Sequence, residues 1–190
     1  MSYLRGYFAK RGYPTARFSY ASLGRTLQDN AQRLFQHLQT RSDTEVTLIA
    51  HSLGGIVVRL MFERYRAQLS HVKAVVSLGS PLYGGSQVAR FISERRLLRW
   101  TLGASDDAPL LQGFQHWDQS VPWLSIAGTK AQGIGRYLGA LKGPGDGTVA
   151  LAETQLPGLR QHTKLPVSHT GMLFSKQVAE TIEAFLIDLK

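Results

Sequence analysis

The chain has 190 residues, 43% of them hydrophobic, which is sufficient for a full core, so we expect residues 1–190 to form a single domain. It has no cysteine, which excludes disulfides, thiolate nucleophiles and thiolate metal sites. The formal net charge at pH 7 is +9, but the basic residues are scattered rather than interleaved with aromatic residues in a stripe, so we expect a solvated basic surface and no nucleic-acid partner.

Short apolar runs alternate with longer segments of helical periodicity along most of the chain. The expected helices cover residues 2–11, 23–38, 53–68 and 175–190, and the expected strands cover residues 16–20, 46–50, 72–78, 122–127 and 163–167. The strands are continuous apolar runs, as in a parallel sheet that is buried on both faces. The sequence therefore predicts a three-layer α/β domain with a mostly parallel sheet flanked by helices.

The stretch that contains Ser52 joins an apolar strand to an apolar helix through small residues, in the sequence Ala50-His51-Ser52-Leu53-Gly54. A serine at such a turn has an exposed hydroxyl, and the N–H groups of the first helical turn can meet a developing negative charge. Ala50 and Gly54 allow the strand and the helix to approach closely. We interpret Ser52 as a nucleophile, and an ordinary strand-to-helix turn is the alternative.

A serine nucleophile needs a histidine base, and His169 is the best placed of the six histidines. It lies between the last expected strand and the last helix, at the edge of the sheet where catalytic groups gather. A loop histidine that caps the helix is the alternative. His51 is adjacent to Ser52 and is expected to line the pocket or to support the turn.

The base in turn needs an acid that orients it, and Asp146 is the best candidate. The acids considered are Asp106, Asp107, Asp118, Asp146 and Glu153. Asp146 lies in a loop after the third buried strand, and the glycines on either side allow its carboxylate to enter a tight corner. An aspartate in an ordinary Asx turn is the alternative.

Four blocks in this order resemble bacterial α/β-hydrolases of the lipase and carboxylesterase group. They are Ala50-His51-Ser52-Leu53-Gly54-Gly55, Ser77-Leu78-Gly79-Ser80-Pro81 with Gly84-Gly85-Ser86, Gly145-Asp146-Gly147-Thr148-Val149, and Ser168-His169. The resemblance implies ester hydrolysis with Ser52 as nucleophile, His169 as general base and Asp146 as its orienting acid. It also implies that the N–H of Leu53 stabilises the oxyanion, with His51, Pro81 and Leu82 lining the substrate pocket.

The chain departs from this group at its N-terminus. In the group, a strand that ends in a His-Gly loop precedes the first helix, and the loop supplies the second oxyanion donor. No such segment precedes residues 2–11, so we expect a truncated chain that natively begins upstream; closure of the gap by neighbouring strands, or a strand from another chain, are the alternatives. Residues 87–120 correspond to a lid or acyl-pocket cover, or else to ordinary core helices.

The resulting expectation is a lipase or esterase that acts on a small-molecule or lipid ester, with transient contact to a lipid surface. An acyltransferase or thioesterase would use the same chemistry, and a non-catalytic binding domain is the alternative from a different class. We expect no cofactor and no metal site. The first residues contain no apolar run of signal-peptide length, so a cytoplasmic location is the default expectation.

Overall fold

A computed structural model describes residues 1–20, 24–41, 44–95, 108–118, 120–137 and 139–189. Four parallel strands form one sheet in the order β1-β2-β3-β4. The strands are β1 (Val46–His51), β2 (Val72–Leu78), β3 (Trp123–Gly128) and β4 (Gln161–Leu165). Parallel strands end at the same edge of the sheet, so the segments that follow β1, β3 and β4 can meet there.

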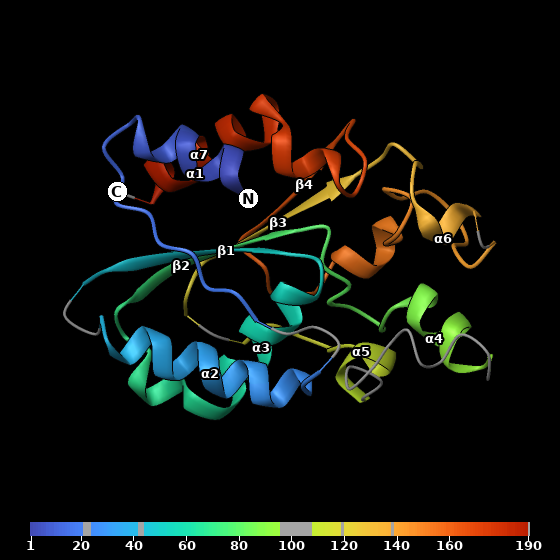
Figure 1. Cartoon of the computed structure of the whole chain (residues 1–190), viewed down its shortest axis with the longest axis horizontal. Coiled ribbons are helices and arrows are strands. Elements are labelled where there is room, and N and C mark those ends of the chain that lie inside the picture. The colour runs from blue at the N-terminus through green and yellow to red at the C-terminus, as the bar shows by residue number, and fades with distance from the viewer. Residues whose placement is uncertain (21–23, 42–43, 96–107, 119, 138, 190) are drawn as a thin grey trace.

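Helices cover both faces of this sheet, which confirms the predicted three-layer α/β fold (Figure 1). One face carries α1 (Ser2–Ala9) and α7 (Lys176–Asp188), and the other carries α2 (Leu27–Gln39) and α3 (Leu53–Tyr65). Three shorter helices lie beyond the carboxyl ends of the strands, at the right of Figure 1. They are α4 (Gln87–Ser93), α5 (Ala108–Gln112) and α6 (Ile134–Tyr137).

The continuous apolar runs of the strands follow from this double covering. Val75 packs into the core shared with α2 and α3, whereas the next residue, Val76, packs into the core shared with α1 and α7. Both side chains are fully buried. Because successive side chains of a strand point to opposite faces, a strand that is buried on both faces favours apolar residues at successive positions.

The structure confirms most of the predicted elements and corrects several. The strand at 72–78 has the predicted limits, and the last strand begins at Gln161 rather than at 163. The helix predicted to reach residue 68 ends at Tyr65 and continues as a 3-10 turn, η1 (Arg66–Gln68). Three short elements that the sequence did not indicate are α6, η3 (Leu151–Thr154) and η4 (Gly171–Phe174). Each is at most a single turn, too short for a periodic pattern.

The strand predicted at residues 16–20 was wrong. These residues are extended but join no ladder, and they run from the α1 layer past β1 to the α2 layer (Figure 1). Phe18 and Tyr20 instead stack on each other at 6.3 Å between ring centroids and pack against the core beneath β1. Their alternating pattern therefore reflects one buried side, and a strand also requires a hydrogen-bonded neighbour.

The segment predicted as a lid or as core helices is described only in part, because residues 96–107 lie outside the described ranges. On either side of that gap, Ala89 of α4 and Leu110 of α5 are buried in the main core. The main-chain N–H of Ser86 donates to the carbonyl of Leu110 at 2.8 Å, which ties the two helices together. The described flanks are thus packed core, and a lid function stays a prediction.

Candidate active site

The turn after β1 holds Ser52 in a conformation that L-amino acids rarely adopt. Its φ is 55° and its ψ is −124°, and no other non-glycine residue in the described ranges has a positive φ. Small neighbours make the turn fit: a Cβ added to Gly54 would lie 3.4 Å from that of Ala50, and one added to Gly55 would overlap the side chain of Ser80. Such local strain is typical of functional positions.

The structure brings Ser52, His169 and Asp146 into one hydrogen-bonded line. The Oγ of Ser52 lies 3.0 Å from the Nε2 of His169, and the Nδ1 of His169 lies 2.7 Å from the Oδ2 of Asp146. A carboxylate can only accept, so Nδ1 carries the hydrogen. Nε2 of the neutral ring is then free to accept the hydroxyl hydrogen of Ser52. These residues follow β1, β4 and β3 respectively, at the shared carboxyl edge of the sheet.

Asp146 is 1% exposed, and its carboxylate is fully occupied. Oδ1 accepts the N–H groups of Thr148 and Val149 at 2.9 Å and 2.7 Å, while Oδ2 faces His169. The main-chain carbonyl of Asp146 also accepts the N–H of His169 at 3.1 Å. The contact with Thr148 is an Asx turn, so the alternative considered from the sequence is also present. Oδ1 stabilises the loop, and Oδ2 orients the imidazole.

Two glycines beneath the site were not recognised from the sequence as part of it. Gly79 directly follows β2 with a φ of +54°, and a Cβ there would lie 2.7 Å from Oδ2 of Asp146 and 3.0 Å from Nδ1 of His169. Gly128 ends β3, where a Cβ would lie 2.7 Å from the Cβ of Asp146. The sequence feature that could have indicated both is a glycine at the carboxyl end of a strand.

The remaining predicted site residues fall into two groups. Leu53 opens α3, where main-chain N–H groups have no carbonyl a turn earlier in the helix to bind. His51 lies against His169, with 4.6 Å between ring centroids. Pro81 and Leu82 are buried, and Leu82 lies in the main core, so neither offers a surface to a ligand in this structure. The pocket and oxyanion roles stay predictions.

Two further titratable groups, Glu153, which is buried, and Tyr20, which is partly buried, lie close to these loops. Glu153 in η3 was weighed as an acid from the sequence, but its Oε1 accepts the N–H of Gln87 at 2.9 Å and burial raises its pKa to about 7. Tyr20 approaches Gly54, and burial raises the pKa of its phenol to about 12. Neither environment could be predicted from a local sequence pattern, because both depend on how distant segments pack together.

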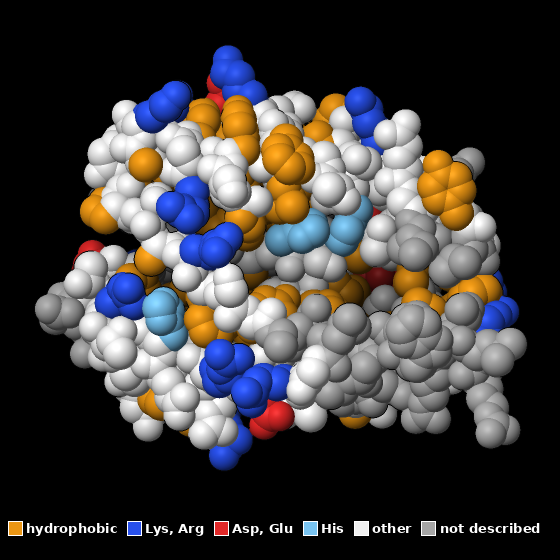
Figure 2. All heavy atoms as spheres, in the orientation of Figure 1, with side chains coloured by type: hydrophobic (Ala, Val, Ile, Leu, Met, Phe, Trp, Pro, Cys, Tyr) orange, Lys and Arg blue, Asp and Glu red, His pale blue; other side chains and the backbone are white. Residues whose placement is uncertain are grey.

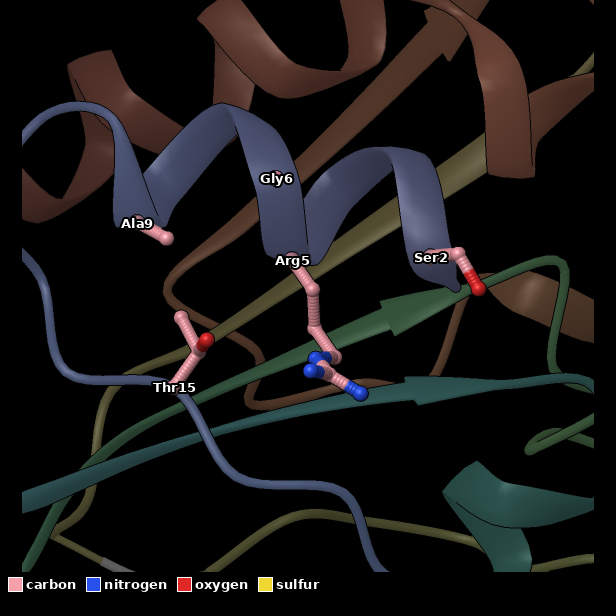
Figure 3. A pocket seen from close by; sticks show the side chains of 5 residues that line it. All are labelled: Ser2, Arg5, Gly6, Ala9 and Thr15. Carbon is pink, nitrogen blue, oxygen red and sulfur yellow. The ribbon is translucent and has the colours of Figure 1, made fainter.

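The face of the molecule that Figure 2 shows is hollowed. Figure 2 shows histidine side chains lying together at the rim of a hollow that crosses the molecule. A separate pocket of ≈ 260 Å³ lies between α1 and the segment that follows it, and Arg5 points from α1 toward the strands (Figure 3). The lining residues are Ser2, Arg5, Gly6, Ala9 and Thr15. Ser52, Asp146 and His169 are not among them, so we assign this pocket no part in the site.

The described ranges contain no group of three or more His, Asp or Glu side chains that could hold a metal ion. Within the same ranges, no helix combines the length and the apolar character that crossing a bilayer requires.

The chain has an α/β-hydrolase fold, which it shares with solved structures of a lipase, a phospholipase and an N-acyl homoserine lactone degrading enzyme. The match to the mature lipase BlEst2 of Bacillus licheniformis covers 88% of this chain and 76% of the lipase chain, at 21% identity and a TM-score of 0.58. Phospholipase PlaB of Legionella pneumophila matches 80% of this chain and 41% of its own, at 18% identity and a TM-score of 0.58. Est816, described as an N-acyl homoserine lactone degrading enzyme, matches 90% of this chain and 78% of its own, at 13% identity and a TM-score of 0.55.

The chain belongs to the family described as a domain of unknown function, DUF7379, whose model matches residues 9–114. No curated protein matches the sequence significantly. Asp146 and His169 lie outside the matched range, whereas Ser52 lies inside it. The likeness to the solved structures, at these identities, establishes the fold, and the chemistry must be argued from the side chains.

Proposed function

We propose that this protein is a serine hydrolase that cleaves carboxylic esters through an acyl-enzyme on Ser52. The observation that carries the proposal is the line from Ser52 Oγ through His169 to Asp146, with separations of 3.0 Å and 2.7 Å, at a strained turn. The same constellation of nucleophile, base and orienting acid recurs on unrelated folds wherever a serine attacks an acyl group.

In the first half of the reaction, Ser52 Oγ attacks the ester carbonyl carbon while its proton passes to Nε2 of His169. The buried carboxylate of Asp146 stabilises the imidazolium that forms. The N–H of Leu53, at the start of α3, donates to the oxyanion. When the tetrahedral intermediate collapses, the C–O bond of the ester breaks and the leaving alkoxide takes the proton from Nε2, which leaves the acyl group on Ser52.

In the second half, His169 takes a proton from a water molecule, whose oxygen attacks the acyl-enzyme. Collapse returns the proton to Ser52 Oγ and releases the carboxylic acid. Ester and water are thus converted into alcohol and acid. A lipase, a phospholipase and a lactone-degrading enzyme are among the proteins with this fold, and their named substrates contain carboxylic esters, which supports this choice of substrate class.

The proposal is tested by hydrolysis of p-nitrophenyl acetate and p-nitrophenyl octanoate, with Ser52→Ala beside a matched control, Ser19→Ala, at an exposed serine away from the site. We expect Ser52→Ala to lose roughly 10³-fold or more of kcat and Ser19→Ala to retain wild-type activity. A preference for the longer ester would indicate a lipase. A folded wild-type protein that hydrolyses neither ester would favour a non-catalytic binding domain.

A further inference from the structure

His51 makes a hydrogen bond that joins the residue next to the nucleophile to the main chain of the base. This hydrogen bond takes no part in the proposed proton transfers. His51 is the residue immediately before Ser52, and its Nε2 lies 3.0 Å from the main-chain carbonyl oxygen of His169. The two imidazole rings are 4.6 Å apart with an interplanar angle of 44°. The side chain therefore spans from the end of β1 to the loop that carries the base.

The direction of this hydrogen bond follows from its partners. A carbonyl oxygen can only accept, so Nε2 of His51 must carry a hydrogen. Burial, and after it electrostatic repulsion between the two neighbouring imidazoles, lowers the pKa of His51 to about 4. At neutral pH His51 is therefore an uncharged ring in the Nε2–H form, and it places no positive charge against the imidazolium that forms on His169.

With this contact, His169 is held at four points. Its N–H donates to the carbonyl of Asp146 at 3.1 Å, its Nδ1 donates to Oδ2 of Asp146, and its Nε2 faces Ser52. The first two points fix the base relative to the acid loop. The fourth point is the main-chain carbonyl of His169, which accepts the hydrogen bond from His51. This contact connects the main chain of the base to the end of β1, next to the nucleophile.

We propose that His51 is a positioning residue, which sets the distance between Ser52 and His169 by donating from Nε2 to the main-chain carbonyl of the base. This rests on the proposed ester hydrolysis. A displacement of about 1 Å between reacting groups can cost ~10²-fold in rate, so a single tie between the two backbones is sufficient to affect catalysis. A histidine that merely lined the pocket would alter substrate binding instead.

The first test compares His51→Phe, which keeps a ring but has no donor, with His51→Gln, whose amide N–H₂ can reach the same carbonyl. We expect His51→Phe to lower kcat ~10–100-fold with KM within about threefold of wild type. His51→Gln should recover most of that loss. The matched control, His37→Phe on α2, should retain wild-type kinetics. A rise in KM with kcat unchanged, or equal losses in the Phe and Gln variants, would overturn the proposal.

The second test needs no variant and stands even where His51→Phe does not fold. Protein labelled with ¹⁵N-histidine is examined by long-range ¹H–¹⁵N NMR near pH 7, where His51 should give the pattern of the neutral Nε2–H form. An Nδ1–H form or a charged ring would overturn the proposal. Wild type without esterase activity would count against the proposed function, whereas active wild type with equally active His51→Phe would count against the role of His51 alone.

Discussion

The stability of the Glu153→Gln variant relative to the wild-type protein should increase as the pH rises. Glu153 is 4% exposed, and its Oε2 is buried without a hydrogen-bond partner among the described residues. Burial is the main reason that its pKa is raised, whereas the N–H of Gln87 and the charge of Arg90 oppose the shift. Protonation relieves the cost of burying the charge, and glutamine removes that charge permanently.

The sign and size of the effect follow from linkage. The pKa of Glu153 in the folded protein is about 7, against the ordinary glutamate value of 4.5, so the folded protein binds the proton more tightly than the unfolded chain. The stability that protonated Glu153 contributes is complete below about pH 4.5 and is lost as the pH rises to about 7. The loss reaches about 3 kcal/mol at high pH, and about 2 kcal/mol of it falls between pH 5 and pH 8.

Urea unfolding followed by tryptophan fluorescence at pH 5, 6.5 and 8 measures this directly. The stability of Glu153→Gln relative to wild type should rise by about 2 kcal/mol from pH 5 to pH 8. The exposed Glu94→Gln serves as the control for the change in net charge and should show a flat difference. A difference for Glu153→Gln that is equally flat, or that falls with pH, would refute the reasoning.

Three further changes probe the site and the core. Asp146→Asn should leave the fold intact but lower kcat by ~10³–10⁴-fold, because the amide no longer holds His169 in the Nδ1–H form; ester hydrolysis and circular dichroism check this. Gly79→Ala should lower kcat by ~10²-fold and destabilise the fold by about 1–2 kcal/mol, since its Cβ would lie 2.7 Å from Oδ2 of Asp146 at a positive φ; unchanged kinetics would contradict the placement of that glycine. Trp123→Phe should cost about 1–3 kcal/mol in urea unfolding, because Nε1 of Trp123 donates to Oγ of Ser77 at 2.9 Å and both side chains are fully buried.

Features of the fold and the site could be predicted from the sequence where neighbouring residues determine them, and not where residues far apart in the chain do. The strand 72–78 was predictable because five of its seven residues are apolar. The residues now found in one line were also indicated, since Ser52, Asp146 and His169 each come after a strand of the parallel sheet, and parallel strands end at one edge. The sequence could locate the three loops but could not give the distances between their side chains.

Features that arise from packing between distant segments were not predictable. Phe18 and Tyr20 alternate as in a strand, and only the absence of a pairing neighbour shows that they are not one. The contact of His51 with the carbonyl of His169 joins residues 118 positions apart. The pKa of Glu153 likewise depends on α4 docking against η3. In each case the determining partner lies far along the chain, outside any local pattern.

The central claim is that Ser52 is a nucleophile activated by His169, and covalent labelling tests it most directly. The protein is treated with a fluorophosphonate, the adduct is counted by intact mass, and its position is mapped by proteolysis and mass spectrometry. We expect a single adduct on Ser52, with a labelling rate at least ~10³-fold lower in His169→Ala. An adduct on another residue, or an unlabelled wild-type protein that is correctly folded, would contradict it.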